Sequence, residues 1–390
     1  MNNKKLLYLH QYYYTNASGT GTRSYEFSRF LSKNGIRVHI ITGTEPEIDT
    51  TCTNLFIHST RTKYSHKMSG RRRVLSFLTY NIKAIIKGLQ IGKIDIVFAT
   101  STPLTIGFPA VILSRLKKAK LVFEVRDIWP DIPIELGYVK NKIVIKLLKK
   151  FEMWIYMNSQ KIIVLSPGMY KNLANKGVEK EKISIIENMA NLYLYDAIKH
   201  SKREDNIKDK FVCIHPGTIG HVNGVDYILE VAREVVKTDK DIVFLLIGDG
   251  KEKKHIEKRV EDENLFNVLL REPVKKREIA KIIKASDIGI MCVNNKYSIL
   301  KHNCANKLFD FMAAGLPILI NYEGWQKDVI EKSNCGRSDI DPCEMANTIL
   351  RLKSDNALRE EMKKNSRMLA EKRYSNILAS KKLLGIINNL

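Results

Sequence analysis

The stretch 211–238, FVCIHPGTIGHVNGVDYILEVAREVVKT, decides how the second half of the chain folds. It begins with an apolar run, continues into a glycine-containing turn, and from Val225 repeats apolar side chains at helical spacing. A second apolar run, Asp241–Ile247, follows that helix. A strand, a crossover helix and another strand predict a parallel sheet with right-handed connections.

The same alternation extends in both directions from this stretch. The second half has further expected strands near 268–270, 288–292 and 317–321, expected helices near 251–263, 275–284 and 306–314, and terminal helices over 354–390. The first half has expected strands at 5–10, 37–42, 94–99, 120–124, 161–165 and 183–186, with expected helices at 23–34, 74–89 and 144–158.

A length of 390 residues exceeds one ordinary hydrophobic core and fits two domains. The polar stretch Asn191–Lys210 lacks periodicity and is expected to be the linker. We therefore predict an α/β protein with domains over 1–198 and 205–373. Two consecutive open sheets predict a central cleft, with ligands at the carboxyl ends of the strands.

The chain is strongly basic: 65 Lys and Arg face 42 Asp and Glu, for a formal net charge of +23. This favours polyanionic partners such as lipid headgroups or phosphorylated substrates, although a merely solvated basic surface stays open. Six scattered cysteines without a Cys-x-x-Cys pair indicate a reducing compartment. With no signal-peptide pattern and no apolar run of about 18 residues, we expect a cytoplasmic protein, at most peripheral to a membrane.

Two glycine-containing turns stand between an expected strand and an expected helix. Gly19 and Gly21 lie in the first, and Gly217, Thr218 and Gly220 lie in the second. Small residues let backbone amides approach a phosphate at a helix N-terminus. Neither turn is a dinucleotide-binding fingerprint or a P-loop, so plain strand-to-helix turns remain an alternative. A third turn, 248–250, fits a simple tight turn.

The helix that starts at Asn306 carries Lys307 and Asp310 on one face, because they are three residues apart. The ammonium of Lys307 could meet a phosphate, and the carboxylate of Asp310 could accept two ribose hydroxyls. On spacing alone, an i,i+3 surface ion pair between the two fits slightly better.

A third cluster, 124–131, follows the strand at 120–124 and combines carboxylates, an arginine and a tryptophan. Such side chains suit sugar binding, since aromatic faces pack on sugar rings and carboxylates accept hydroxyls. The alternative is an Arg126–Asp127 pair with Trp129 in the core. The segment Arg61–Arg73, with His66 and Lys67 among its basic residues, precedes an amphipathic helix. It predicts either contact with anionic lipid or a solvated loop beside a core-facing helix.

Together these motifs resemble the retaining glycosyltransferases of family 4, which have the GT-B fold of two Rossmann-like domains with parallel sheets facing a central cleft. The resemblance covers nearly the whole chain and is strongest to bacterial surface-polysaccharide enzymes of the N-acetylfucosamine-transferase type. It rests on 19–21, 126–131, 217–226, 246–250, 285–287 and 306–317. It implies that the last helix, Tyr374–Leu390, packs back on the first domain.

The resemblance also implies a UDP-sugar donor, with an N-acetylated deoxyamino hexose, and a lipid-linked or saccharide acceptor in O-antigen or capsule synthesis, with no metal or other cofactor. Asp310 matches the second acid of the family's E-x7-E motif, and His302 stands where many members have the first. Candidate catalytic residues are Asp127, first, and Glu124. Candidate acceptor contacts are Arg126, Trp129 and Asp131. Candidate donor contacts are Gly19, Gly21, Gly217, Thr218, Gly220, Arg271, Lys275, His302, Asn306, Lys307 and Asp310.

Three alternatives remain at this point. A nucleotide-sugar epimerase would share the architecture but would need several acid/base groups around the sugar and no acceptor site. A nucleic-acid-binding protein would account for the charge, yet no binding module is recognisable. A non-catalytic polysaccharide-binding protein is compatible with the lack of an acid at position 302.

Overall fold

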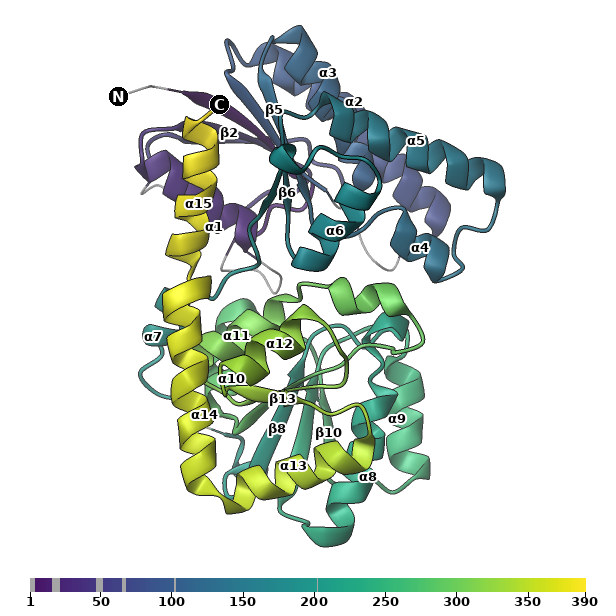
Figure 1. Cartoon of the computed structure of the whole chain (residues 1–390), viewed down its shortest axis with the longest axis vertical. Coiled ribbons are helices and arrows are strands. Elements are labelled where there is room, and N and C mark those ends of the chain that lie inside the picture. The colour runs from purple at the N-terminus through teal and green to yellow at the C-terminus, as the bar shows by residue number, and fades with distance from the viewer. Residues whose placement is uncertain (1–3, 16–21, 47–51, 65–67, 102, 202) are drawn as a thin grey trace. The chain divides into compact units, whose positions relative to one another are not determined.

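The computed structural model describes residues 4–15, 22–46, 52–64, 68–101, 103–201 and 203–390. The chain divides into two compact units, each built around a parallel sheet (Figure 1). The first unit contains the chain up to Glu187 together with Ile377–Leu390, and the second contains Asn188–Asn376. This division precedes position 198, where we expected the first domain to end.

The first unit has a seven-stranded sheet in the order β3-β2-β1-β4-β5-β6-β7. Its strands are β1 (Lys5–Leu9), β2 (Arg37–Thr42), β3 (Leu55–Ser59), β4 (Ile96–Thr100), β5 (Lys120–Val125), β6 (Lys161–Val164) and β7 (Ile183–Ile185). Its helices are α1 (Arg23–Lys33), α2 (Gly70–Gln90), α3 (Gly107–Leu116), α4 (Asp131–Glu135), α5 (Lys142–Asn158), α6 (Pro167–Asn175) and α15 (Asn376–Asn388).

The second unit has a six-stranded sheet in the order β10-β9-β8-β11-β12-β13. Its strands are β8 (Phe211–Pro216), β9 (Ile242–Ile247), β10 (Val268–Arg271), β11 (Ile288–Met291), β12 (Ile318–Ile320) and β13 (Gly336–Ser338). Its helices are α7 (Leu192–Asp196), α8 (Asp226–Thr238), α9 (Lys253–Asp262), α10 (Lys276–Ala285), α11 (Asn306–Ala314), α12 (Trp325–Lys332), α13 (Pro342–Ser354) and α14 (Asn356–Leu369).

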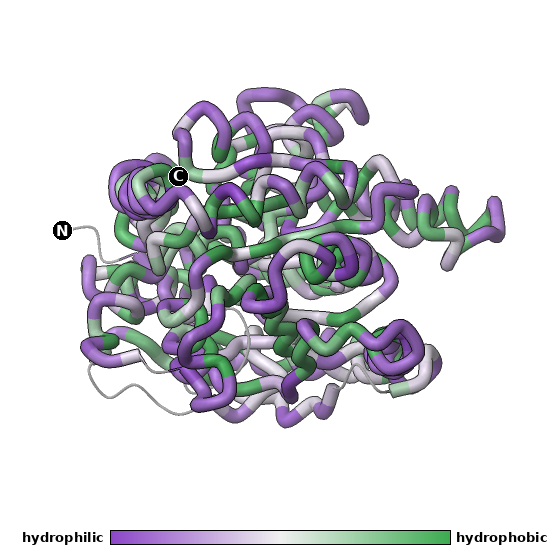
Figure 2. The backbone as a smooth tube through the Cα atoms, turned by 90° about the horizontal axis from the view of Figure 1, so that it is seen from below, coloured by the Kyte–Doolittle hydropathy of each residue, from purple (hydrophilic) through white to green (hydrophobic). Residues whose placement is uncertain are grey.

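Apolar strands and the inner faces of the helices form the core of each unit. In the second unit, Ile228, Leu229 and Val235 of α8 pack with strand residues such as Phe244 in one buried cluster. The hydropathy colouring of the backbone shows how the outer helices mix apolar and polar residues along their length (Figure 2). This is the pattern expected for helices that cover a buried parallel sheet.

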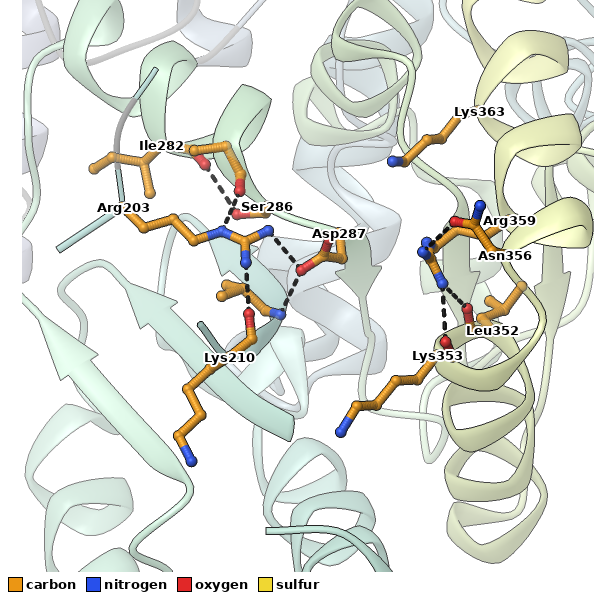
Figure 3. Close-up of polar contacts among 12 residues, drawn as sticks. Arg203, Lys210, Ile282, Ser286, Asp287, Leu352, Lys353, Asn356, Arg359 and Lys363 are labelled. Atoms are coloured by element: carbon orange, nitrogen blue, oxygen red, sulfur yellow. Dashed lines mark hydrogen bonds and ion pairs between the residues drawn. The ribbon is translucent and has the colours of Figure 1, made fainter. Parts of the chain in front are cut away.

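The predicted linker 191–210 is not an extended linker. It contains α7 and a short 3-10 helix, Asp205–Ile207, and it lies inside the second unit. The side chain of Arg203 secures it, donating to the carbonyl oxygen of Ala285 at 2.7 Å and to a carboxylate oxygen of Asp287 at 2.7 Å (Figure 3). The same Asp287 oxygen accepts from the backbone N–H of Val212 at 2.8 Å. The Ala-Ser-Asp motif thus fixes the start of β8.

The last helix, α15, lies in the first unit apart from its first residue. The ammonium of Lys4, just before β1, donates to the carbonyl oxygens of Ile387 and Asn388 at 2.9 Å each. These bonds satisfy carbonyls that a helix C-terminus leaves without intrahelical partners.

Three helices of the first unit, α2, α3 and α5, form a layer in which α3 is central (Figure 1). Gly88 of α2 lies so close to α3 that an added Cβ would come within 2.6 Å of Leu113. Gly107 of α3 is equally close to α5, where an added Cβ would come within 2.2 Å of Ile155. In the part of the chain that the structure describes, no helix is long and apolar enough to cross a bilayer.

Candidate functional site

The second unit has a topological switch point between β8 and β11, where the strand order reverses direction. Open parallel sheets bind ligands beside the carboxyl ends of the strands at such a point. The loops after the two strands meet there, since the N–H of Asn294 donates to the carbonyl of Val222 at 3.0 Å. Gly224 has a φ of +57°, and an added Cβ would lie 2.7 Å from the carbonyl oxygen of Val293. Only glycine fits this approach of the two loops.

The glycine turns after β8 and β9 pack directly on each other. A Cβ on Gly248 would lie 1.7 Å from the carbonyl oxygen of Gly217, and one on Gly250 would lie 2.0 Å from that of Ile219. The tight turn at 248–250 therefore shapes the predicted phosphate turn. Thr218 is exposed and Gly220 is partly buried, with room for a Cβ. Gly19 and Gly21 of the other predicted turn lie outside the described residues.

Lys307 lies in the first turn of α11 and reaches the switch point. Its Nζ is 3.1 Å from Nε2 of His215, and it would be 3.2 Å from a Cβ placed on Gly217. Nδ1 of His215 lies 3.0 Å from the carbonyl oxygen of Ile290, which can only accept, so Nδ1 carries the proton and Nε2 accepts from the ammonium. Burial lowers the pKa of Lys307 to about 8 and, with the nearby ammonium, lowers that of His215 well below its usual value.

No ion pair among the described residues joins Lys307 to a carboxylate. A partly buried cation without an acidic partner is costly unless an anion joins it. The ammonium, the glycine turn and the N-terminus of α11 therefore make a site suited to a phosphate group. The predicted i,i+3 ion pair between Lys307 and Asp310 is wrong, because the two side chains engage different partners.

Asp310 lies one turn further along α11 and is 9% exposed. Nζ of Lys276 donates to both of its carboxylate oxygens, at 2.7 and 2.6 Å. The phenol side chain of Tyr195, on α7, is buried close to Asp310. Burial and then the negative charge of Asp310 raise the pKa of Tyr195 well above its usual value. Three helices thus converge on one carboxylate.

The segment that leads into α11 is firmly held. The side-chain amide of Gln326 donates to the carbonyl oxygen of Asn303 at 2.6 Å and to its side-chain oxygen at 3.0 Å. The indole N–H of Trp325 also donates to the Asn303 carbonyl, at 3.0 Å. His302 ends the 3-10 helix Ser298–His302, and both it and Asn306 are partly buried. Helix α12 therefore fixes Asn303, which lies between these two residues along the chain.

The two basic candidates near β10 are placed differently from Lys307. The guanidinium of Arg271 pairs with Glu204, at 2.7 Å for the shortest contact, and Lys275 is exposed as the N-cap of α10. The residue that reaches Asp310 is the next one, Lys276, which our sequence analysis missed. A signal existed, because Lys276, Ala280 and Ile283 share the buried face of α10 at helical spacing.

The first unit has its own switch point, between β1 and β4. His10 follows β1 and is 3% exposed, with Nδ1 at 2.6 Å from the hydroxyl of Ser24. Burial, assisted by the charge of Arg126, lowers the pKa of His10 to about 3, so this imidazole is neutral. The backbone N–H of Arg126 donates to Ser101 at 2.9 Å. His10, Ser101 and Arg126 are thereby gathered at the carboxyl ends of β1, β4 and β5.

The candidates that follow β5 differ in exposure. Asp127 is exposed, whereas Arg126 and Trp129 are partly buried. Asp131 begins α4 and pairs with Lys176 at 2.8 Å while accepting from Asn172 at 3.1 Å. Lys176 also pairs with buried Glu152 at 2.6 Å. Asp131 is thus engaged within the first unit.

Glu124 is fully buried in β5. One carboxylate oxygen accepts from Nε of Arg23 at 2.9 Å, and the other accepts from the hydroxyl of Thr100 at 3.0 Å. The guanidinium of Arg23 also donates to the carbonyls of Ile186 and Glu187. The buried contacts of Glu124 tie β5 to its neighbours within the first unit. Of the two candidate bases, Asp127 is the exposed one.

Two family models together match almost the whole chain. The model described as Glycosyltransferase Family 4 matches residues 17–193, and the model described as Glycosyl transferases group 1 matches residues 196–368. The boundary between the matches lies close to the boundary between the two units.

Among curated proteins, the chain is similar to alpha-D-kanosaminyltransferase of Streptomyces kanamyceticus, with 23% identity over 219 residues, 54% of this chain and 55% of that one. It is also similar to poly(ribitol-phosphate) alpha-N-acetylglucosaminyltransferase of Staphylococcus aureus, with 32% identity over 127 residues, 32% of this chain and 24% of that one. The chain thus spans about half the length of these relatives, or less.

Among solved structures, the chain is similar to Anabaena Alr3699/HepE in complex with UDP-glucose. The TM-score is 0.70 at 15% identity, over 99% of this chain and 100% of that one. At this identity the likeness concerns the fold, which both proteins share along their whole length.

Proposed function

We propose that this chain, a transferase enzyme of the glycosyltransferase class with the GT-B fold, moves a sugar from a uridine-diphosphate donor to a hydroxyl of a lipid-linked or saccharide acceptor. The donor sugar is proposed to be an N-acetylated deoxyamino hexose, transferred with retention into a surface polysaccharide such as O-antigen or capsule. The amino-sugar names of the two curated relatives and the UDP-glucose held by the structural relative support this choice. The epimerase and polyanion-binding alternatives have no support among these relatives.

One observation carries the proposal: the Lys307 ammonium stands at the switch point of the second unit with no acidic partner among the described residues. In glycosyl transfer, the bond between the sugar C1 and the diphosphate oxygen breaks, and UDP leaves with the electron pair. The negative charge that develops on the leaving diphosphate is what the site must chiefly stabilise. Lys307 and the amides around Gly217 would meet the diphosphate, and Asp310 would accept the ribose hydroxyls.

The acceptor oxygen forms the new bond to C1, and its proton passes to a diphosphate oxygen or to a carboxylate. We assign the carboxylate role to Asp127, which is exposed at the carboxyl end of β5. Arg126 and Trp129, its neighbours, would contact the acceptor. Positive charge comes from side chains and helix ends in this scheme, so the reaction is proposed to need no metal ion.

The direct test incubates the purified chain with a panel of UDP-sugars and a lipid-linked or synthetic saccharide acceptor, with products read by mass spectrometry. Glycosylated acceptor, formed equally with a metal chelator present, is the expected result. Epimerised donor without acceptor, or thermal stabilisation by a short duplex and not by UDP, would overturn the proposal.

Asp127→Asn is expected to lower kcat by about a hundredfold or more with both substrates saturating, as loss of a general base does. The substitution keeps the shape and removes only the charge, so the KM for the donor should change little. Glu181→Gln, an exposed change elsewhere in the first unit, is the control. Turnover of the Asp127 variant near that of the control would remove Asp127 from the chemical step.

We further propose that the chain works at the cytoplasmic face of an anionic membrane, which the α2-α3-α5 layer would contact. The apolar stripe of α2 does not face the core as the alternative required: Leu75, Leu78 and Ile82 are 64%, 51% and 61% exposed. In α5, Ile143 and Leu147 are 71% and 61% exposed. Exposed apolar groups next to cations are typical of helices that lie at a membrane surface.

The cations beside these apolar groups belong to the same two helices. They are Arg71, Arg72, Lys83, Lys142, Lys146, Lys149 and Lys150, all exposed. Helix α5, which reaches the right edge of Figure 1, mixes hydrophobic and hydrophilic residues in Figure 2. The segment 65–67, with His66 and Lys67 of the predicted basic patch, lies outside the described residues.

Binding to phosphatidylglycerol vesicles is expected to fall as salt rises, and to weaken about tenfold or more when Arg71, Arg72 and Arg73 are changed to Ser, since each basic residue near such a surface contributes about 1 kcal/mol. The matched control changes Lys251, Lys254 and Lys258, exposed lysines of the second unit, to Ser. Vesicle flotation measures both. Flotation that ignores salt, or equal losses in the two variants, would contradict the proposed surface.

A further inference from the structure

The pair formed by Lys276 and Asp310 has a geometry that a simple surface ion pair lacks. Both residues are 9% exposed, and one ammonium donates to both oxygens of the carboxylate. Lys276 is the first residue of α10, and Asp310 lies in the second turn of α11. The plane of the carboxylate is therefore fixed by a group from a different helix.

A second observation marks the surroundings of this pair. Tyr195 is 1% exposed, and its hydroxyl lies beside the carboxylate of Asp310, outside ordinary hydrogen-bond geometry. Helix α7, which carries it, is clamped in place: Lys284 of α10 donates to the carbonyl of Tyr195 at 3.0 Å, and Arg367 pairs with Asp196 at 2.7 Å. Buried polar groups are normally satisfied, so a hydroxyl in this position beside a carboxylate indicates a place for a further hydrogen-bond partner, such as a ligand or water.

The acceptor sites on the Asp310 carboxylate show how the Lys276 ammonium restricts its hydrogen bonding. An ionised carboxylate has about four acceptor sites, two on each oxygen. Lys276 uses one site on each oxygen, which leaves one on each for a second partner with two donors side by side. A ribose offers two neighbouring hydroxyls of this kind, whereas a 2′-deoxyribose offers one.

We propose that Lys276 is a positioning residue that holds Asp310 as a paired acceptor for both ribose hydroxyls, and thereby sets the preference of the second unit for ribonucleotides over 2′-deoxyribonucleotides. This inference rests on the proposed function, because it requires the donor ribose at Asp310. Lys276 itself touches no substrate in this scheme; it acts through the carboxylate.

The test compares the binding of UDP and 2′-deoxy-UDP by calorimetry in the full-length chain. The wild type should bind UDP about ten- to a hundredfold more tightly, the range for one hydrogen bond to a charged group. Lys276→Met should bring that ratio towards one and raise the KM for the donor more than it lowers kcat. Lys281→Met, on the exposed side of the same helix, is the control and should keep the wild-type ratio.

A second variant covers the possibility that Lys276→Met does not fold. Lys276→Gln keeps an uncharged NH2 group that can donate to the carboxylate, and its ratio is expected to fall between those of Met and the wild type. A folded Met or Gln variant with the wild-type ratio would overturn the positioning role. A wild-type chain that binds neither nucleotide would instead overturn the proposed function, so the two failures are distinguishable.

Discussion

Asp310→Asn is expected to weaken UDP binding by about a hundredfold and to lower the stability of the second unit at the same time. Each hydrogen bond to a charged group contributes about 1.5–3 kcal/mol, and two ribose hydroxyls would lose the charge of their acceptor. The amide also presents one acceptor oxygen in place of two. The binding loss therefore follows from both charge and geometry.

The loss of stability has a separate cause. With Asp310 neutral, the ammonium of Lys276 is left buried without a counter-charge. Removing one partner of a buried pair costs about 3–5 kcal/mol, so the thermal midpoint of unfolding should fall clearly. Calorimetric titration with UDP and thermal unfolding without ligand measure the two effects independently.

Asp262→Asn is the matched control for this prediction, because Asp262 is exposed at the end of α9 in the same unit. It should change neither quantity by more than a few tenths of a kcal/mol. If Asp310→Asn lost stability but kept the UDP affinity of the control, the carboxylate would be structural only, and the ribose site would lie elsewhere.

The fold could be predicted from the sequence because its strands are buried on both faces. Continuous apolar runs such as 96–99 and 242–247 predict a parallel sheet, because no polar residues alternate with the apolar ones. The exceptions follow the same physics. β3, the edge strand at 55–59, is partly exposed and contains His58, so it lacked that signal. β13 at 336–338 is only three residues long.

The site could be predicted only where a residue lies in a local pattern. The glycine turn at 217–220 and the spacing of Lys307 and Asp310 are visible along the chain, whereas the partners of these residues are not. Asp310 meets a lysine 34 residues earlier and Lys307 meets a histidine 92 residues earlier. Such pairs arise from the way α10, α11 and β8 come together, and periodicity within one element carries no information about them.

The same limit explains Glu124. In the sequence it is the second candidate base after Asp127, but a strand alternates its side chains between the two faces of a sheet. In the structure Glu124 is the second-to-last residue of β5 and its side chain is fully buried. Arg23 and Thr100 each donate to one of its two carboxylate oxygens. The predicted strand 120–124 already contained Glu124. Distinguishing the two acids required knowing the partners of Glu124, which lie 101 and 24 residues away along the chain.

Lys307→Met is expected to abolish most of the UDP affinity, about a hundredfold or more, while leaving the ligand-free chain at least as stable as the wild type. The reason is that the wild-type ammonium is partly buried and has no carboxylate partner in the described residues, so it is costly until a diphosphate arrives. Lys332→Met, an exposed change in α12, is the control and should alter neither property. A ligand-free Lys307→Met chain that is much less stable would mean that the lysine is a packing residue.

The pH dependence of folding stability and of UDP binding distinguishes this role of Lys307 from a role in packing. Burial lowers the pKa of Lys307 from 10.5 to about 8. Between these two values the unfolded chain keeps a proton that the folded chain has lost, so the stability of the ligand-free wild type should gain a rising contribution from this residue across that window.

UDP binding needs the charged form, so it should weaken as the pH rises through about 8, and binding just above that pH should take up a proton. Calorimetry in buffers of different ionisation enthalpy measures that uptake. The Met variant should show neither the stability gain nor the proton uptake, and a wild type that binds UDP without taking up a proton would separate Lys307 from the diphosphate.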